Sequence, residues 1–358
     1  MRPFLPLLMF AAALPAAGAA PTTMIYVSLA GENRIAVYRI NSDLGTLTRT
    51  GTLDTGGAPG ALAVDPQRKF LYASVRSTQS LAAYRIHPET GDLTPINSIR
   101  VGIDAAFVRV DRSGKFLVSA YYTAGQVLVH AIRPDGSLEP EPRSKVETAP
   151  CAHCVGLTSD NRFVFVPHTA PEAIFQFRLD PETGRLTAND PAQTATPPGT
   201  GPRHIRFHPT KPIAYVANEQ GSSVTVYPVV ARTGTLGAPL QTLPTLPADF
   251  QGKNSCAEIH LHPSGHYLWV SNRGHDSLAG FAVDAETGKL TATGHTSTPK
   301  TPRSFALEPA GRFAYAAGQG STQLAAYKVQ PDTGALTPIH TYEVGPQPAW
   351  VEIIALPE

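Results

Sequence analysis

The chain has 358 residues, of which 42% are hydrophobic and 16% charged, and its formal net charge is +1. Because Lys and Arg are scattered and nearly balanced by Asp and Glu, the composition excludes nucleic acid and an anionic membrane as implied partners. The 34 prolines and 30 glycines predict many short strands joined by turns.

Residues 1–20 have the features of an export signal. They carry one Arg, an apolar stretch over residues 4–14 and small residues at 17–19 that suit a signal peptidase. We therefore expect a cleaved signal peptide over residues 1–20 and a mature domain over residues 22–358, located in the periplasm or secreted. An N-terminus retained as an anchor is the alternative. No later apolar stretch has the length of a membrane span, so no membrane contact is expected after cleavage.

Only three cysteines are present, which is too few and odd in number for a disulfide scaffold. The segment Cys151-Ala152-His153-Cys154 offers two thiolates and an imidazole, but Cys256 is the only other cysteine and the spacing is not that of a zinc ribbon. The order of residues also differs from a haem-attachment motif, which needs His after the second Cys. We expect no metal or other cofactor, and either a local disulfide or two thiols at Cys151 and Cys154.

A pattern of two strands joined by a turn recurs along the chain. Its clearest copy is GPRHIRFHPTKPIAYVANE at residues 201–219, where an alternating strand precedes a turn and a second apolar run. Similar pairs occupy residues 61–76, 107–122, 257–273 and 304–319. The sequence is therefore built from repeats.

The second strand of each repeat marks its period. Successive starts lie 46, 46, 47, 50, 54 and 46 residues apart, and this spacing with four strands per repeat is typical of a propeller blade. The expected starts are Met24, Phe70, Phe116, Phe163, Ile213, Tyr267 and Phe313.

Four repeats contain a turn of the Pro-Glu-Thr-Gly type, at residues 87–91, 180–184, 284–288 and 330–334. Proline or a small residue opens the turn, and glycine accepts the positive φ at its end. We expect these turns to be hairpin connections without a functional role.

The two ends of the chain complement each other. The last strand, residues 349–355, has the pattern of a first strand, whereas the chain begins with a second strand at residues 24–29. Pairing them removes two open edges. We therefore predict an all-β fold: a monomeric seven-bladed β-propeller with four-stranded antiparallel blades, closed by pairing of the N- and C-terminal strands.

Some repeats carry polar residues, whose burial costs free energy, at positions where the other repeats have small or apolar residues. These positions are the starts of the innermost strands and the ends of the second strands, which lie on the same face because the two strands are antiparallel. We expect them to gather at one mouth of the central channel. The candidate residues are Tyr121, His153, Arg203, His204, Glu219, Glu258, Arg273, His275 and Arg303.

Arginines and imidazoles around one carboxylate are typical of an anion-binding site with a proton-transfer group. His153 or Glu219 is the candidate general base on water. The alternative is that Arg203 and Glu219 form a structural ion pair and that each His satisfies a strand end. The chain has neither a Gly-x-Ser-x-Gly elbow nor a phosphate-binding glycine loop, so a serine hydrolase or nucleotide enzyme is not indicated.

Several motifs in fixed order resemble the bacterial propeller-type 6-phosphogluconolactonases and, through them, the fungal muconate-lactonizing cycloisomerases. The motifs are GPRHIRFHP with YVANE, CAEIHLHPSGHYLWVSNRGHDS, TPRSFALEPAGRFAYAAGQ and VGPQPAWVEII. The resemblance runs from about Met24 to Ile354. It implies a lactone-opening or lactone-closing propeller that requires no metal. The implied catalytic residues are His153, Arg203, Glu219 and Arg273. From the comparison of the repeats, we expect the substrate-binding residues to be His204, Tyr121, His275, Glu258 and Arg303.

We therefore expect a carboxylic-ester hydrolase that converts 6-phosphogluconolactone or an unphosphorylated aldonolactone into the sugar acid. Water is activated by the His or Glu, and Arg stabilises the oxyanion and binds the substrate anion. Export is a departure from the cytosolic family members, because a phosphorylated intermediate should be scarce outside the cytosol. The alternatives are an exported propeller that binds a ligand or protein without catalysis, and a cycloisomerase acting on a muconate-like diacid.

Overall fold

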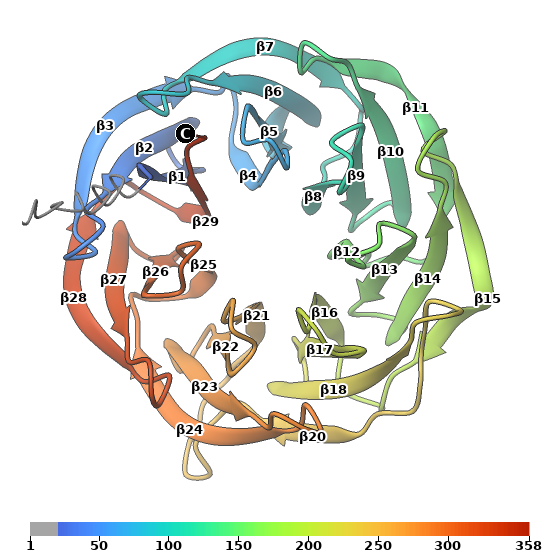
Figure 1. Ribbon diagram of the computed structural model, residues 1–358, viewed down its shortest axis with the longest axis vertical. Coiled ribbons are helices and arrows are strands. Elements are labelled where there is room, and N and C mark those ends of the chain that lie inside the picture. Colours follow the sequence, from blue (N-terminus) through green and yellow to red (C-terminus); the bar gives the residue numbers. More distant parts are fainter. Residues whose placement is uncertain (1–20, 358) are drawn as a thin grey trace, which may run out of the picture.

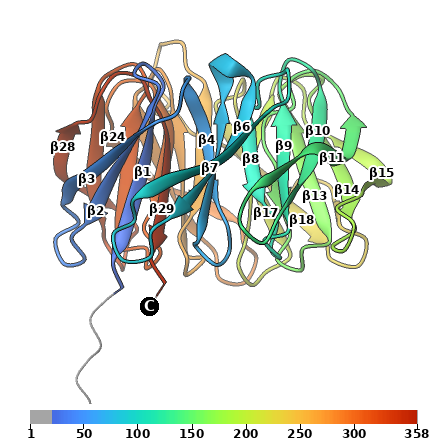
Figure 2. The same cartoon turned by 90° about the horizontal axis from the view of Figure 1, so that it is seen from above.

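The computed structural model describes residues 21–357, which form seven antiparallel sheets around a central channel (Figure 1). In the side view, the strands run between the two faces of this ring (Figure 2). The predicted seven-bladed propeller is therefore confirmed. The leader predicted over residues 1–20 lies outside the described residues.

Each blade has an inner strand along the channel and a second strand packed behind it. The inner strands are β4 (Pro59–Val64), β8 (Phe107–Val110), β12 (Gly156–Leu157), β16 (Pro202–Phe207), β21 (Cys256–Leu261), β25 (Pro302–Leu307) and β29 (Pro348–Ala355). The second strands are β1 (Thr23–Leu29), β5 (Phe70–Val75), β9 (Phe116–Tyr121), β13 (Phe163–His168), β17 (Ile213–Asn218), β22 (Tyr267–Asn272) and β26 (Phe313–Gly318). Six of the seven predicted starts coincide with these bounds, and β1 begins one residue earlier than expected.

The third and fourth strands complete each blade toward the outside. The third strands are β2 (Arg34–Ile40), β6 (Ser80–Ile86), β10 (Gln126–Ile132), β14 (Ala173–Leu179), β18 (Ser223–Val230), β23 (Ser277–Val283) and β27 (Gln323–Val329). The outer strands are β3 (Leu47–Asp54), β7 (Leu93–Arg100), β11 (Leu138–Glu147), β15 (Leu186–Ala195), β24 (Leu290–Ser297) and β28 (Leu336–Glu343), with β19 (Thr235–Leu236) and β20 (Gln241–Pro244) sharing this place in one blade. One 3₁₀ turn, η1 (Arg76–Thr78), follows β5.

Burial follows the layer of the strand. The second strands β5, β9 and β13 are buried throughout, because neighbouring blades cover both faces of each sheet. The outer strands carry exposed residues along most of their length. This difference explains why the second strands are continuous apolar runs in the sequence.

The ring closes as predicted, through antiparallel pairing of β1 with β29. The register runs from Thr23 opposite Ala355 to Leu29 opposite Pro348. The blade that contains both ends is therefore a complete four-stranded sheet, in the order β29-β1-β2-β3.

A second contact locks adjacent blades together. The first residue of six second strands, and the second residue of β1, packs against a glycine in the turn before the outer strand of the next blade, where φ lies between +67° and +91°. A Cβ atom on Gly91, for example, would lie 2.6 Å from the Met24 side chain. Tyr26 also donates a hydrogen bond from its hydroxyl to the Gly91 carbonyl at 2.9 Å. The Pro-Glu-Thr-Gly turns thus join blades as well as strands, a role that the sequence analysis missed.

The starts of several inner strands are irregular. The register with the second strand shifts between Pro202 and His204 in β16, and equivalent shifts occur in β4, β21 and β25. An extra residue at such a bulge changes which side chains face the channel. The bulges therefore lie where the candidate site was predicted.

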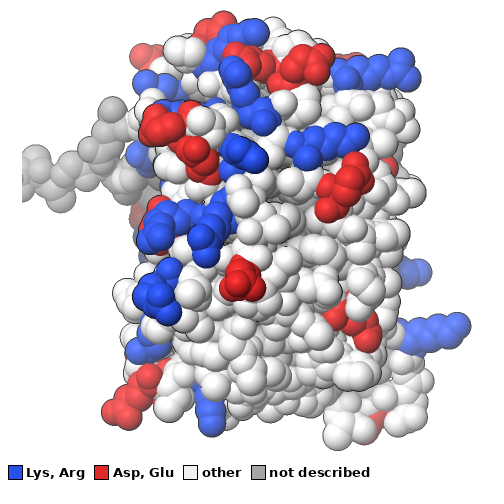
Figure 3. Space-filling model, turned by 90° about the vertical axis from the view of Figure 1, so that its right-hand side faces the viewer, with Lys and Arg blue, Asp and Glu red and all other residues white. Residues whose placement is uncertain are grey.

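The face of the molecule shown in Figure 3 carries charges of both signs. Lys and Arg are interspersed with Asp and Glu on the face shown in Figure 3. Leu44, Val230 and Leu240 are the large apolar side chains that are clearly exposed in the described part, and they lie singly. No helix within residues 21–357 is long and apolar enough to cross a membrane.

Candidate functional site

A cavity of about 360 Å³ lies at the mouth of the channel where the inner strands begin. We call it the first cavity. Its lining includes the inner-strand residues Gly60, Arg203, Arg303 and Trp350 and also His153, which precedes β12. The concentration of predicted polar residues at one mouth is therefore present in the fold.

His153 is the imidazole that lines the first cavity. It is 5% exposed, and the rings of Tyr122 and His204 lie 5.6 and 5.1 Å from it, measured between centroids. Its Nδ1 atom is buried and has no hydrogen-bond partner in the described residues. Burial, followed by the positive charge of Arg203, holds the pKa of His153 well below its usual range. At neutral pH this ring is uncharged and can accept a proton.

Arg203 lies behind His153 and is held by a carboxylate. Its side chain is 1% exposed, and its Nε atom lies 3.1 Å from Oε2 of Glu219. The geometry at that distance is not that of a hydrogen bond, so this contact is an ion pair. Arg273 donates to the other carboxylate oxygen of Glu219 at 2.7 Å. Glu219 thus lies between two guanidinium groups that come from different blades.

The charges in this group shift one another's pKa values. Burial raises the pKa of Glu219, but Arg203 and Arg273 outweigh this effect and hold it below its usual value. Burial and the nearby Arg273 and Arg303 lower the pKa of Arg203 to about 9, so it remains charged at neutral pH. Two cations share one carboxylate, which leaves an excess of positive charge beside the first cavity.

Two further arginines line the first cavity. Arg303 has no carboxylate within 4 Å among the described residues, whereas Arg76 forms a salt bridge with Asp104, with Nη2 to Oδ2 at 2.6 Å. Burial, followed by Arg273, lowers the pKa of Arg303 to about 10. Sequence reasoning did not include Arg76 and Asp104 in the site. The signal was available for Arg76, because it follows a second strand at the same repeat position as Glu219.

His204 and Glu258 lie deeper in the channel than predicted. Both are 0% exposed, and the Nδ1 atom of His204 lies 2.8 Å from Oε1 of Glu258. Arg206 donates to the same carboxylate oxygen at 2.9 Å. Neither His204 nor Glu258 lines the first cavity. Their prediction as groups at the mouth is corrected: side chains two residues apart on an inner strand face the channel at successive depths.

Tyr121 and His275 also lie elsewhere. Tyr121 is 1% exposed within the core, and its hydroxyl is hydrogen-bonded to Ser119, because strand alternation directs Tyr122 rather than Tyr121 toward His153. His275 follows β22, and its contacts are Ser277, Phe250 and His295, none of which lines the first cavity. Both predicted placements at the mouth are therefore corrected.

The three cysteines are free thiols. Cys154 and Cys256 are buried, and burial raises the pKa of both thiols, which makes them poor nucleophiles. No group of three or more His, Cys, Asp or Glu side chains with a metal-binding arrangement occurs in residues 21–357. The local disulfide that the sequence left open at Cys151 and Cys154 is therefore not formed.

This arrangement has the parts needed for water-mediated attack on a carbonyl group. A neutral imidazole can remove a proton from water, and an adjacent buried cation can stabilise the oxyanion that forms. A propeller with such a cavity can carry out ester hydrolysis.

Comparisons with known proteins agree with this chemistry. A family model described as a lactonase with a seven-bladed β-propeller matches residues 20–353. The chain therefore belongs to the seven-bladed β-propeller lactonase family, whose members are carboxylic-ester hydrolases.

Individual relatives are similar over most of their length. The 6-phosphogluconolactonase of Pectobacterium carotovorum is 34% identical over 93% of this chain and 85% of its own. That of Cronobacter sakazakii is also 34% identical, over 78% of this chain and 69% of its own. The solved structure of a periplasmic gluconolactonase from Pseudomonas aeruginosa is 30% identical, with a TM-score of 0.84, covering 94% of this chain and 100% of that one.

Proposed function

We propose that the protein hydrolyses an aldonolactone, either 6-phosphogluconolactone or its unphosphorylated counterpart, to the sugar acid without a metal. The observation that carries the proposal is the pairing of neutral His153 with buried, charged Arg203 in the lining of one cavity. The names of the relatives, 6-phosphogluconolactonase and gluconolactonase, support the substrate class.

His153 is the general base in this proposal. It takes a proton from a water molecule as the water oxygen bonds to the lactone carbonyl carbon. The carbonyl oxygen becomes an oxyanion beside Arg203, whose charge is strengthened by its dry surroundings. The bond from that carbon to the ring oxygen then breaks, and the ring oxygen takes the proton from His153. The product is the open hydroxy acid, and the base is restored.

Arg303 and the Arg76–Asp104 pair bind the rest of the substrate. Arg303 lacks a carboxylate partner in the described residues, so it is the cation best suited to a phosphate or a polarised hydroxyl. Asp104 offers carboxylate oxygens to sugar hydroxyls. This division leaves the reacting carbonyl to Arg203 and His153.

Glu219 and Arg273 act as positioning residues. Neither lines the first cavity, but Glu219 contacts Arg203 with one oxygen and Arg273 with the other. Fixing the guanidinium before the substrate arrives lowers the reorganisation needed at the oxyanion. Of the two candidate bases, His153 is therefore the better suited, since two cations engage the Glu219 carboxylate.

We further propose that the protein is exported. The leader-like composition of residues 1–20 supports this, as does the similarity to a periplasmic gluconolactonase. Fractionation of expressing cells with mass measurement of the mature chain tests it. A periplasmic protein that begins near residue 20 is expected; a full-length chain in the cytosol would overturn the export proposal and leave the hydrolase proposal intact.

The test of catalysis is the rate of acid release from fresh 6-phosphogluconolactone and glucono-δ-lactone. Wild type should exceed the spontaneous rate, and His153→Gln should lower kcat by about 10²-fold. Arg203→Met should lower kcat/KM by a similar factor, on the order of 10²-fold, through loss of oxyanion stabilisation. His87→Gln and Arg39→Met, which change exposed residues of the same types, are the matched controls.

The outcomes separate the competing functions. Loss of hydrolysis in the two site variants with retention in the controls supports the proposal, and the ratio of the two rates identifies the better substrate. Wild-type rates equal to the blank on both lactones would reject hydrolysis and favour a non-catalytic ligand-binding propeller.

A further inference from the structure

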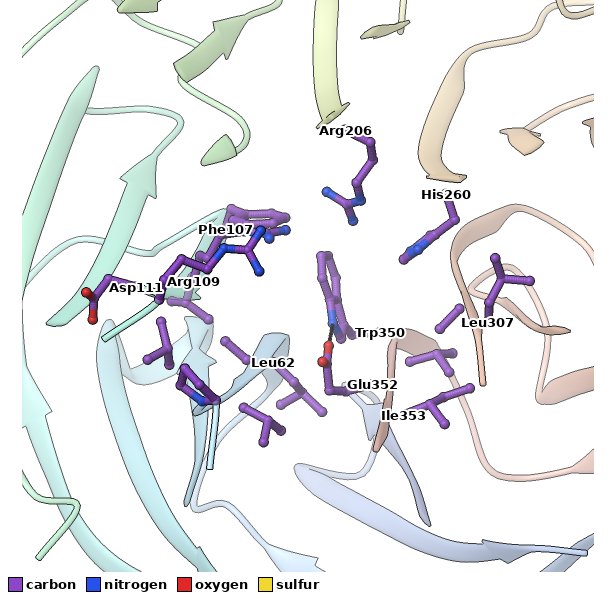
Figure 4. A pocket seen from close by; sticks show the side chains of 18 residues that line it. Leu62, Phe107, Arg109, Asp111, Arg206, His260, Leu307, Trp350, Glu352 and Ile353 are labelled. Carbon is purple, nitrogen blue, oxygen red and sulfur yellow. Dashed lines mark hydrogen bonds between the residues drawn. The ribbon is translucent and has the colours of Figure 1, made fainter. Parts of the chain in front are cut away.

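The opposite mouth of the channel holds a second cavity of about 350 Å³. It lies where the inner strands end, and its lining includes Phe107, Arg109, Arg206, His260 and Glu352 (Figure 4). None of these residues lines the first cavity. The second cavity is therefore distinct from the first cavity.

Trp350 adjoins both cavities, because it is part of the lining of each. Its indole ring meets the ring of Phe107 at 5.4 Å and that of His204 at 6.2 Å, and Phe107 and His204 are themselves 5.4 Å apart. These three rings therefore pack against one another where the two cavities approach each other.

Two guanidinium groups are directed toward the space around Trp350 from neighbouring sides of the second cavity (Figure 4). Arg206 is paired with Glu258 at 2.9 Å. Arg109 lies over the ring of Phe107, 5.4 Å from its centroid, and forms no salt bridge with any residue in the described range. Its Nε atom is buried without a hydrogen-bond partner. Burial and the nearby Arg206 lower the pKa of Arg109 to about 10, so it is charged at neutral pH.

The acidic residues of the second cavity do not neutralise Arg109. Asp111 points away from the cavity (Figure 4), where it accepts hydrogen bonds from the backbone N–H of Phe116 at 2.8 Å and the side chain of Asn161 at 2.7 Å. Glu352 accepts a long hydrogen bond of 3.4 Å from the Trp350 indole. Burial raises the pKa of Glu352 to about 7, so much of it is uncharged at neutral pH. Arg109 is only partly buried, but its buried Nε donor lacks an acceptor, which is costly unless an anion pairs with it.

We propose that the second cavity is an anion-binding site that takes a small carboxylate or phosphate between Arg109 and Arg206. Arg109 supplies donors that have no protein acceptor, and Arg206 supplies charge while it remains anchored to Glu258. Trp350 forms an apolar floor. His260 and Glu352 lie at the sides of the site, where either can donate a hydrogen bond to an oxyanion. The proposal does not depend on the reaction assigned to the first cavity.

Calorimetric titration with inorganic phosphate and, separately, with sodium gluconate tests this site and shows which oxyanion it prefers. Arg109→Met should weaken one binding component by at least about tenfold, the loss expected for charge-assisted hydrogen bonds. The matched control is Arg303→Met, which removes the unpaired arginine of the first cavity and should retain that component. Exposed Arg39, which lines neither cavity, gives a second control, Arg39→Met, which should bind as wild type.

Arg109→Met should fold, because no hydrogen bond or salt bridge of the described residues is lost with Arg109. Near-ultraviolet circular dichroism and lactone hydrolysis, both expected to be unchanged, verify this. Arg109→Lys, which keeps the charge but not the planar fork, should bind with intermediate affinity. The proposal is overturned if Arg109→Met titrates like wild type with both anions, or if Arg303→Met alone abolishes all binding.

Discussion

The Nδ1 atom of His204 lies 2.8 Å from Oε1 of Glu258, and both side chains are out of reach of solvent. Burial and the charge of Arg203 hold the pKa of His204 well below its usual range, so the neutral ring donates its Nδ1 hydrogen to the carboxylate. Arg206 supplies the positive charge that balances Glu258. This buried group lies between the two cavities and connects three inner-strand side chains.

Loss of Glu258 should destabilise the fold. Glu258→Ala leaves the Arg206 charge and the His204 donor without their acceptor, and breaking a buried pair in this way typically costs about 3–5 kcal/mol. Glu258→Gln should cost less, since its amide oxygen still accepts a hydrogen bond. Urea unfolding measures both, with exposed Glu141→Gln as the control. Equal stability of Glu258→Ala and wild type would show that the buried pair contributes nothing.

The acidic limb of kcat/KM should report the protonation of His153. The pKa of His153 is lowered, and the neutral form is the base, so activity should stay constant as pH falls through the usual pKa range of histidine and decline only below that range. Arg303 is one of the charges that lower the pKa of His153, so Arg303→Met should raise this pKa and move the acidic limb of kcat/KM toward higher pH. Arg39→Met, on the outer surface, should leave the limb in place. A limb unaffected by Arg303→Met would place the titrating group elsewhere.

Glu352 should make the fold less stable as pH rises. Its pKa is raised to about 7 in the folded protein, above the usual value near 4.3 for an unfolded chain, so the folded state binds this proton more tightly. The contribution of Glu352 is therefore favourable at low pH and is lost between about pH 4 and pH 7. Glu352→Gln removes this dependence.

Stability curves of Glu352→Gln and wild type at pH 5 and pH 8 measure the effect. From pH 5 to pH 8, the free energy of unfolding of the variant should rise by on the order of 1–3 kcal/mol relative to that of wild type. Glu141→Gln should show no such gain. A constant difference between Glu352→Gln and wild type at both pH values would contradict a raised pKa.

The glycine lock between blades can be measured with a matched pair of substitutions. Gly184 and Gly102 have φ values of +75° and +84°, but a Cβ on Gly184 would lie 2.6 Å from Phe116, whereas one on Gly102 meets nothing within 4 Å. Both Ala variants pay about 1 kcal/mol for backbone strain. Gly184→Ala should lose about 1–3 kcal/mol more through overpacking. If thermal or urea unfolding showed equal losses of stability for the two variants, the contact between Gly184 and Phe116 would accommodate the added Cβ atom without overpacking.

Repetition made the fold predictable from sequence. Six second strands begin where their apolar runs predict, and β29 pairs with β1 because each supplies the strand that the other lacks. The blade contacts of the turn glycines were missed, since a glycine at positive φ satisfies a hairpin and gives no sign of the Phe or Met side chain from the next blade.

The candidate site was predictable in part. His153, Arg203 and Arg303 share a cavity because they occupy equivalent positions at the starts of inner strands or just before them. Tyr121 was misplaced because strand alternation directs Tyr122 toward His153 instead. The sequence also did not show how deep in the channel each polar side chain lies. The register shift between Pro202 and His204, together with the two-residue period of β16, places these side chains at different depths.

The second cavity escaped sequence reasoning for a related reason. Arg109 and Glu352 lie near the ends of inner strands, whereas the comparison of repeats considered the starts of those strands. Nothing in one sequence shows that a single Trp side chain lines cavities at both mouths of the channel.

The pairing of Thr23 with Ala355 has a consequence for orientation. These residues lie at the end of the ring away from the Leu29–Pro348 end, where the first cavity opens, so a surface or fused domain attached near either residue would face away from that cavity (Figure 2). The same attachment would lie beside the second cavity, whose lining includes Glu352 and Ile353 of β29. A protein tethered there would keep its proposed catalytic face toward the surroundings and its arginine-lined face toward the anchor.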